Sequence, residues 1–272
     1  MRSAWDRVWI VIPAFDEAAT IRVLAEAALA LCPRVVVVDD GSRDGTAERV
    51  ADLPLTLLRH EANRGKAASL RSAFSHALRH DAEAAITLDG DGQHDPADLP
   101  RLLSAWRAHP GRLVIGSRLH DRAAFPPSRW FGNRFACFWI SWAAGHTIAD
   151  SQTGLRVYPR SVMTLALDGG APSDRFTFES EILIEAAAHG HETLAVPVAG
   201  RYPEGARRSH YRGVVDTARI VAMVAGRLVR RGLVPPGPVA EPAPRVPSAN
   251  RSRHEMNERR RRKTRRTPPC RR

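Results

Sequence analysis

Four consecutive valines, Val35–Val38, constrain the fold of this chain more than any other feature. A strand that is apolar at every position is buried on both faces, which is typical of a parallel sheet covered by helices on both sides. Short apolar runs of the same kind recur at Val8–Ile12, Leu55–Leu58, Ala84–Leu88 and Leu113–Gly116. The sequence therefore predicts a protein of the α/β class.

Segments of helical character separate these runs. Apolar residues recur at helical spacing in Ala18–Leu31, and further helices are expected over Thr46–Ala51, Gly65–His80 and Pro96–Ala108. Strands that alternate with helices predict a doubly wound, mostly parallel sheet of the Rossmann-like type. Ligands of such sheets bind beyond the carboxyl ends of the strands.

Acidic, glycine-rich loops follow three of the predicted strands, at Phe15–Glu17, Asp39–Ser42 and Asp89–Gln93. Asp89 and Asp91 can both offer oxygens to one hard divalent cation, whose remaining ligands are commonly substrate phosphates. The alternative is an acidic turn that begins the next helix, and Asp95-Pro96 is expected to be such a start.

No G-x-G-x-x-G fingerprint follows the first predicted strand, and no Walker A sequence occurs in the chain. Acidic loops repel phosphate unless a metal ion lies between them. The loops therefore predict a nucleotide whose base and ribose meet carboxylates and whose diphosphate meets a divalent ion.

The net charge of +12 is concentrated at one end of the 272-residue chain. Residues Arg251–Arg272 hold 11 Lys and Arg against two Glu, which leaves only +3 for everything before them. The proline-rich Pro235–Pro247 segment is expected to be an extended linker. The basic tail could bind nucleic acid or anionic lipid, or be a solvated, disordered end.

Three widely separated cysteines form no disulfide or metal-ligand pattern, which suits a reducing compartment. The N-terminus is expected to be a first strand rather than a signal peptide, and no apolar run is long enough to predict a transmembrane helix.

Six segments, in order, resemble the inverting GT-A glycosyltransferases: PAFDE, VVVVDDGSRDGT, NRGKAASL, LDGDGQHDP, IGSR and DSQTGLRVYP. Within that family they are most similar to the branch of dolichyl-phosphate mannose synthases and polyprenyl-phosphate glycosyltransferases. The similarity covers roughly Trp9–His210. It implies a catalytic domain of the GT-A type over residues 1–212. The patterns of the remaining residues predict an amphipathic helix over 213–232, and a linker with an Arg-rich tail over 233–272.

The resemblance also implies a nucleotide-sugar donor and a Mg²⁺ or Mn²⁺ ion. The positions that match the donor site are Pro13, Phe15, Glu17, Val38, Asp40, Lys66, Asp89, Gly90, Asp91, Gln93 and Arg208. Among them, Asp89, Asp91 and Gln93 match the D-x-D-x-Q pattern that holds the metal. Asp44, by contrast, is expected to be a turn residue.

On the acceptor side, Arg118 and Arg129 match arginines that grip a lipid phosphate, a role that suits the guanidinium fork. Asn133 stands where the family often has a serine, and Ser209 belongs to a flexible loop with Arg208. These residues are the expected acceptor site.

Glu181 matches an acidic position on a helix expected within Thr177–Ala188. A carboxylate there could act as a base toward an alcohol, whereas a phosphate acceptor is already ionised and scarcely needs one. The expected catalytic residues are Asp91, Arg118 and Glu181.

Trp130–Ala144 holds three of the six tryptophans, and Val214–Val229 has one apolar stripe. Each segment fits either a helix at a membrane surface or a helix packed on the core. Because relatives often continue into transmembrane helices that are not predicted here, we expect a cytoplasmic protein bound peripherally to the inner face of the membrane.

The leading hypothesis is a metal-dependent inverting glycosyltransferase that moves a sugar from a nucleotide diphosphate to a polyprenyl phosphate at a membrane surface. One alternative keeps the donor chemistry but has a hydroxyl acceptor on a sugar, lipid or pigment. A remote alternative is a nucleic-acid-binding protein that acts through the Arg-rich tail. We expect no specific nucleic-acid partner, because that alternative leaves the acidic strand-end loops without a role.

Overall fold

The computed structural model describes residues 4–119, 127–168, 178–199 and 224–226. The chain divides into two units, residues 1–239 and 240–272, and the second lies outside the described residues. Of the expected C-terminal helix, only residues 224–226 are described, and they are helical.

One sheet of seven strands forms the centre of the first unit, in the order β3-β2-β1-β4-β6-β5-β7. All pairs are parallel except those of β6, which runs antiparallel to both β4 and β5. The strands are β1 (Val8–Ala14), β2 (Val35–Asp39), β3 (Thr56–Arg59), β4 (Ala84–Thr87), β5 (Leu113–Ser117), β6 (Arg156–Pro159) and β7 (Thr193–Pro197). The predicted doubly wound, mostly parallel sheet is confirmed.

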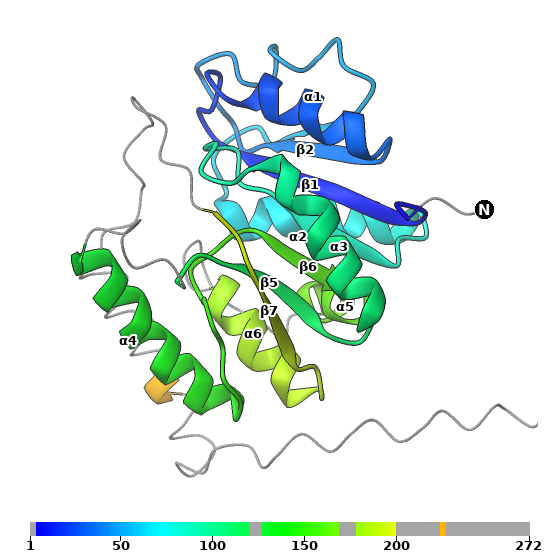
Figure 1. Ribbon diagram of the computed structural model, residues 1–272. Coiled ribbons are helices and arrows are strands. Elements are labelled where there is room, and N and C mark those ends of the chain that lie inside the picture. Colours follow the sequence, from blue (N-terminus) through cyan, green and yellow to red (C-terminus); the bar gives the residue numbers. More distant parts are fainter. Residues whose placement is uncertain (1–3, 120–126, 169–177, 200–223, 227–272) are drawn as a thin grey trace, which may run out of the picture. The chain divides into compact units, whose positions relative to one another are not determined.

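Helices connect the strands and cover both faces of the sheet (Figure 1). They are α1 (Ile21–Leu31), α2 (Lys66–Arg79), α3 (Leu99–Ala108), α4 (Pro127–Ala144), α5 (Arg160–Leu167) and α6 (Phe178–Ala188), with a 3₁₀ turn η1 (Pro96–Asp98) before α3. Asp95 begins that turn as expected, because its side chain accepts the N–H of Ala97.

The expected helix over residues 46–51 was wrong, since a series of turns occupies this segment. Asp44 accepts the N–H of Thr46 and of Ala18, 3.0 and 2.9 Å away. These contacts tie the segment to the loop after β1, and no long apolar face is present to support a helix. Asp44 is therefore a turn residue, as expected.

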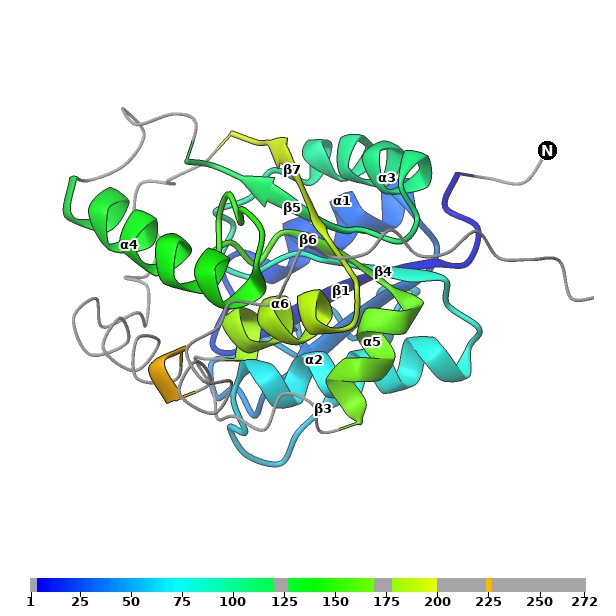
Figure 2. The ribbon, with the colours of Figure 1, turned by 90° about the horizontal axis from the view of Figure 1, so that it is seen from below.

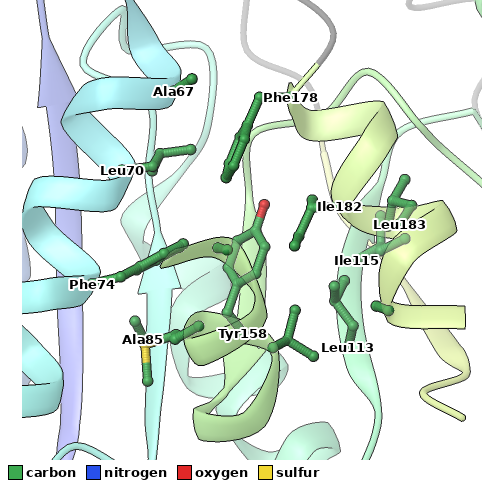
Figure 3. Close-up of a cluster of buried hydrophobic side chains, with 14 of the residues drawn as sticks. Ala67, Leu70, Phe74, Ala85, Leu113, Ile115, Tyr158, Phe178, Ile182 and Leu183 are labelled. Carbon is green, nitrogen blue, oxygen red and sulfur yellow. The ribbon is translucent and has the colours of Figure 1, made fainter. Parts of the chain in front are cut away.

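Successive side chains of a buried strand point to opposite faces of the sheet, and this divides the core into two clusters. Val35 and Val37 pack on the side of α1 and α3, whereas Val36 and Val38 pack on the side of α2, α5 and α6. Seen from below, the two groups of helices lie on opposite faces of the sheet (Figure 2). On the α2 side, the rings of Phe74 and Tyr158 lie 5.0 Å apart at the centre of the cluster (Figure 3).

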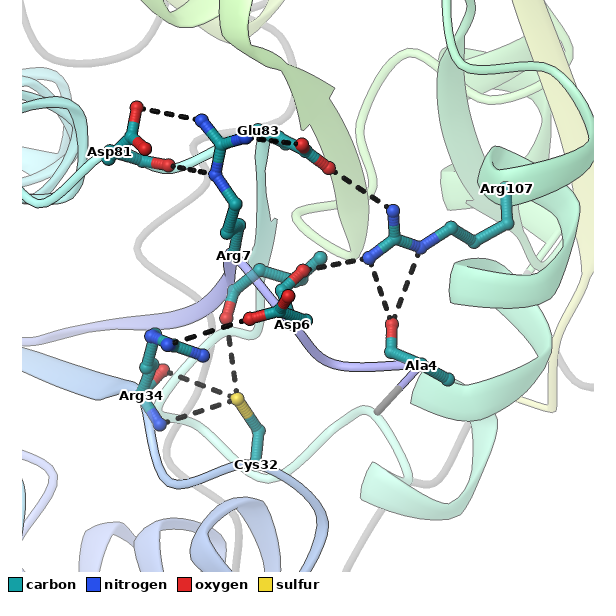
Figure 4. Close-up of polar contacts among 9 residues, drawn as sticks. Ala4, Asp6, Arg7, Cys32, Arg34, Asp81, Glu83 and Arg107 are labelled. Atoms are coloured by element: carbon teal, nitrogen blue, oxygen red, sulfur yellow. Dashed lines mark hydrogen bonds and ion pairs between the residues drawn. The ribbon is translucent and has the colours of Figure 1, made fainter. Parts of the chain in front are cut away.

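The amino edge of the sheet is fixed by arginines (Figure 4). Arg7 Nη1 donates to Glu83 Oε1 at 2.8 Å, and Arg107 Nη2 donates to the carbonyl oxygen of Asp6 at 2.8 Å. Ion pairs as exposed as these add little stability. They align the start of β1 with the start of β4 and leave the carboxyl edge to the candidate site.

The order of the strands in the sheet determines where the candidate site lies. From β1 the chain builds the sheet in one direction through β2 and β3, and then in the other direction from β4. Loops that leave β1 and β4 diverge at such a switch point, and ligands of open α/β sheets bind there. The loop before β6 reaches the same edge, because β6 runs in the opposite direction.

Candidate active site

The loops that follow β1 and β2 are joined by hydrogen bonds. The backbone N–H of Asp16 donates to Ser42 Oγ at 2.9 Å, and the N–H of Glu17 donates to Thr46 Oγ1 at 2.8 Å. Pro13 and Val38 are register partners on the two strands, so the predicted base-binding positions are neighbours.

Asp40 holds the segment that leads into α2. Its carboxylate accepts the N–H of Arg64 at 3.0 Å and of Gly65 at 2.7 Å, and His60 Nδ1 lies 2.7 Å away. Its side chain is almost completely buried by these partners. Asp40 therefore fixes the start of α2, where Lys66 is the first residue.

Lys66 lies between two carboxylates. Its Nζ atom is 2.6 Å from Asp89 Oδ1 and 3.0 Å from Glu179 Oε1. Burial alone would lower the pKa of Lys66, but the two carboxylates outweigh burial and raise it. In the same way, burial would raise the pKa of Asp89, but the Lys66 ammonium lowers it. The ion pairs join α2, the loop after β4 and α6.

Asp91 and Gln93 form the outer part of the same loop. Asp91 Oδ1 accepts the N–H of Gln93 at 3.0 Å, and Gly92 between them has a φ of +73° that favours glycine. Burial and the nearby Asp89 carboxylate raise the pKa of Asp91. Arg118 Nη1, at the end of β5, donates to Gln93 Oε1 at 3.3 Å.

These residues fit a hard divalent cation that a substrate completes. Among the described residues, no three His, Cys, Asp or Glu side chains are grouped to hold a metal by themselves. Asp91 and Gln93 offer oxygens, and a cation would stabilise the Asp91 carboxylate, which burial and Asp89 disfavour. Mg²⁺ in particular is commonly held by one or two carboxylates together with substrate phosphates.

Four residues of the site were not predicted individually: Arg156, His94, Gly154 and Asp150. Arg156 is fully buried and donates to the carbonyl oxygens of Ser151, Thr153 and Glu179 at 2.9, 2.9 and 2.7 Å. It fixes the loop before β6 to the start of α6. The DSQTGLRVYP segment was the only sequence signal for it.

His94 and Gly154 lie against the same carboxyl edge. His94 is 2% exposed, and burial with the charge of Arg118 lowers its pKa to about 4, so the imidazole is neutral near pH 7. A Cβ atom on Gly154 would overlap the carboxylate of Asp89. A residue without a side chain is therefore required beside Asp89.

Two of the residues predicted to bind the acceptor, Arg118 and Asn133, meet at one buried carboxylate, that of Asp150. Arg129 lies in the first turns of α4, but its side chain is outside the described residues, as are Arg208 and Ser209. Glu181 is 4% exposed in the first turn of α6.

The structure thus brings together Asp89, Asp91, Gln93, Lys66 and Arg118, with Phe15, Glu17 and Gly90 on the adjoining loops after β1 and β4.

Comparison with known families agrees with this geometry. The model of the family described as glycosyl transferase family 2 matches residues 9–163, which is more than half of the chain. The chain belongs to this family. It is a glycosyltransferase, and the resemblance to the polyprenyl-phosphate branch is confirmed by its relatives.

Two relatives illustrate that branch. A UDP-N-acetylglucosamine–dolichyl-phosphate N-acetylglucosaminyltransferase of Methanococcus voltae is 26% identical over 72% of this chain and 86% of its own length. A polyprenol monophosphomannose synthase of Mycolicibacterium smegmatis is 28% identical over 71% of this chain and 76% of its own length.

Solved structures support the fold. Glucosyl-3-phosphoglycerate synthase from Mycobacterium tuberculosis, crystallised with Mn²⁺, uridine diphosphate and phosphoglyceric acid, superposes with a TM-score of 0.62. The two chains are 17% identical, and the match covers 84% of this chain and 79% of the other. At this identity the similarity establishes the GT-A fold.

A Gly154→Ala substitution tests whether the placement of Asp89 matters. The new methyl group would displace the Asp89 carboxylate from Lys66, and a displacement of about 1 Å in such a site can cost about 100-fold in turnover. We expect a loss of that order in glycosyl transfer. An unchanged melting temperature would show that the variant is still folded. Gly111→Ala is the control, because a Cβ there has no neighbour within 4 Å. Wild-type turnover in the Gly154 variant would contradict the importance of this close approach.

Proposed function

We propose that this glycosyltransferase is metal-dependent and inverting, and that it transfers a sugar from a nucleotide diphosphate to a polyprenyl phosphate. The observation that carries the proposal is the contact between Gln93 and Arg118, 3.3 Å from Oε1 to Nη1. Gln93 belongs to the loop assigned to the metal and the donor diphosphate, and Arg118 is assigned to the acceptor phosphate. The contact supports donor and acceptor sites that adjoin each other.

The donor lies across the carboxyl ends of β1, β2 and β4. Pro13, Phe15 and Glu17 hold the base, with Val38 and Asp40 beneath the base and ribose. Lys66 and Asp89 lie beside the diphosphate, and Arg208 closes over it. Asp91 and Gln93, with Asp89 beside them, would hold Mg²⁺ or Mn²⁺, which offsets the charge that builds on the departing nucleoside diphosphate.

The acceptor phosphate is held by the guanidinium groups of Arg118 and Arg129, with Ser209 at its edge. Asn133 lies behind Arg118, where its side chain is bonded to Asp150. One of its oxygens attacks the anomeric carbon on the face opposite the nucleotide. A carbon–oxygen bond to the acceptor forms while the bond to the diphosphate breaks, so the configuration inverts. The attacking oxygen is already ionised, so the protein contributes orientation rather than proton removal.

Helix α4 supports a membrane-bound acceptor. Its buried face packs on the core through Ala136, Ile140 and Ala143. The outer face carries a stripe of aromatic residues at helical spacing, namely Phe131, Phe135, Phe138 and Trp142, which are 61, 49, 61 and 38% exposed. Because aromatic rings favour the headgroup region, we propose that this α4 aromatic stripe binds the inner face of the membrane peripherally. Within the described residues, no helix has the length and apolarity needed to cross a bilayer.

A hydroxyl acceptor is the second candidate, and the position of Glu181 favours it. The carboxylate lies almost fully buried in the first turn of α6, the same turn that holds Glu179 against Lys66. A buried carboxylate near the donor could remove the proton of an alcohol.

The main proposal is tested with a panel of UDP- and GDP-sugars and Mn²⁺, each with and without a short polyprenyl phosphate. We expect a metal-dependent product that requires the lipid phosphate.

Asp91→Ala should abolish transfer and metal-dependent donor binding, because it removes the outer carboxylate of the loop. Asp168→Ala, an exposed carboxylate at the end of α5, is the control. Retained turnover in the Asp91 variant would remove the metal site from the proposal.

Glu181→Gln separates the two acceptor classes. If the acceptor is a phosphate, we expect transfer within about three-fold of wild type, since no base is needed. A loss of about 100-fold or more with unchanged donor affinity, as general-base removal typically gives, would favour a hydroxyl acceptor. The measurement is turnover with saturating acceptor, together with calorimetric titration of the donor.

The α4 aromatic stripe is tested by vesicle sedimentation with the double variant Phe131→Ser/Phe138→Ser. Full burial of one Phe side chain contributes about 1.5–3 kcal/mol, so even partial insertion of two rings predicts at least a ten-fold loss of vesicle binding. Val23→Ser is the control, because Val23 is 69% exposed but lies on α1. Equal binding of the double variant and wild type would refute the role of the stripe.

A further inference from the structure

A single buried carboxylate joins α4 to the predicted acceptor arginine. Asp150 is 0% exposed. Its Oδ2 atom accepts the backbone N–H of Arg118 at 3.2 Å, and its Oδ1 atom accepts Asn133 Nδ2 at 2.9 Å and the N–H of Gln152 at 3.2 Å. A buried carboxylate needs such donors, because leaving it without them is costly.

The Asn133 side chain is fully engaged by the protein. The residue is 7% exposed on the inner face of α4. While its Nδ2 atom donates to Asp150, its Oδ1 atom accepts the thiol of Cys137 at 3.3 Å. Both ends of the amide therefore have partners inside the fold, and its contact with the acceptor side runs through Asp150.

Arg118 continues this series of hydrogen bonds on the other side of Asp150. Its backbone is bonded to Asp150 and its guanidinium to Gln93. Hydrogen bonds thus connect the membrane-facing helix proposed above, through Asn133, Asp150 and Arg118, to the loop of Asp91 and Gln93. In a low-dielectric interior, the members of such a network depend on one another.

We propose that Asn133 is a positioning residue, which orients Arg118 toward the acceptor phosphate through Asp150 and so couples the placement of α4 to the acceptor site. The inference rests on the proposed function and deepens it. Without Asn133, Asp150 Oδ1 keeps the N–H of Gln152 but loses its side-chain donor. The carboxylate then shifts toward other donors, and the Arg118 peptide loses its fixed acceptor.

The first test compares Asn133→Ala with wild type by hydrogen–deuterium exchange of the peptide that contains Arg118, and by the KM for a short polyprenyl phosphate. We expect faster exchange at the Arg118 amide and a KM about ten-fold higher, with donor affinity unchanged. Ser141→Ala is the matched control. Ser141 lies on the same helix and accepts the N–H of Ile148 at 2.9 Å, a contact separate from Asp150.

A double-mutant cycle with Arg118→Ala separates positioning from general destabilisation. If Asn133 acts through Arg118, adding Asn133→Ala to the Arg118 variant should leave KM unchanged. An additive effect in that background would overturn the proposal. Equal exchange and equal KM in wild type and Asn133→Ala would also overturn it, whereas failure of the wild type to glycosylate the polyprenyl phosphate would overturn the proposed function instead.

Exchange of the Asn133 and Asp150 side chains gives a rescue experiment. Asn133→Asp places a second carboxylate against Asp150, so one of the two must take a proton. We expect the acceptor KM of this variant, relative to that of wild type at the same pH, to fall as the pH decreases from 8 to 6. Asn133→Asp combined with Asp150→Asn restores a donor–acceptor pair and should recover part of the loss at pH 8. A pH profile identical to that of wild type would contradict the contact.

Discussion

The ammonium group of Lys66, held between the carboxylates of Asp89 and Glu179, is the interaction on which the site depends. It joins three elements that are far apart in the sequence: the first residue of α2, the loop after β4 and the first turn of α6. Each partner would be costly to bury alone, since an unpaired charge in a protein interior has lost its hydration. Asp40 completes this arrangement, because it holds the backbone just before Lys66.

Buried charges also organise the predicted acceptor side, where one cation and one anion are each held by polar groups of the protein. Arg156 is a buried cation that is bonded to three backbone carbonyl oxygens, and Asp150 is a buried anion that is bonded to two backbone N–H groups and an amide. Buried charges of this kind are stabilised by dipoles as well as by ions. The loop of residues 150–155 is consequently held from both ends, and it presents Gly154 to Asp89 without a side chain between them.

Much of the fold could be predicted from local sequence. The fully apolar Val35–Val38 run predicts a strand buried on both faces, and the D-x-D-x-Q order of Asp89 to Gln93 marks the loop beyond β4. The segment after Asp44 was wrongly predicted as helical, because contacts with the loop after β1 determine its shape. Arg156 and Asp150 were missed for a related reason. Their roles come from partners distant in sequence, and a single arginine or aspartate has no local pattern that reveals them.

The antiparallel strand β6 has an implication for how the segment between β5 and β6 can vary. The chain leaves the sheet after β5 at Ser117 and returns at Arg156, on the strand that pairs with β5. The excursion therefore begins and ends on adjacent strands, where Ile115 is the register partner of Arg156. Its length can change without a shift in the register of β1, β2 and β4, which carry the proposed donor loops. The fold thus keeps the strands of the proposed donor loops apart from an excursion whose length can vary between its fixed points. Chimeras joined at Ser117 and Arg156 that keep Arg118, Asp150 and Gly154 would show whether this excursion selects the acceptor.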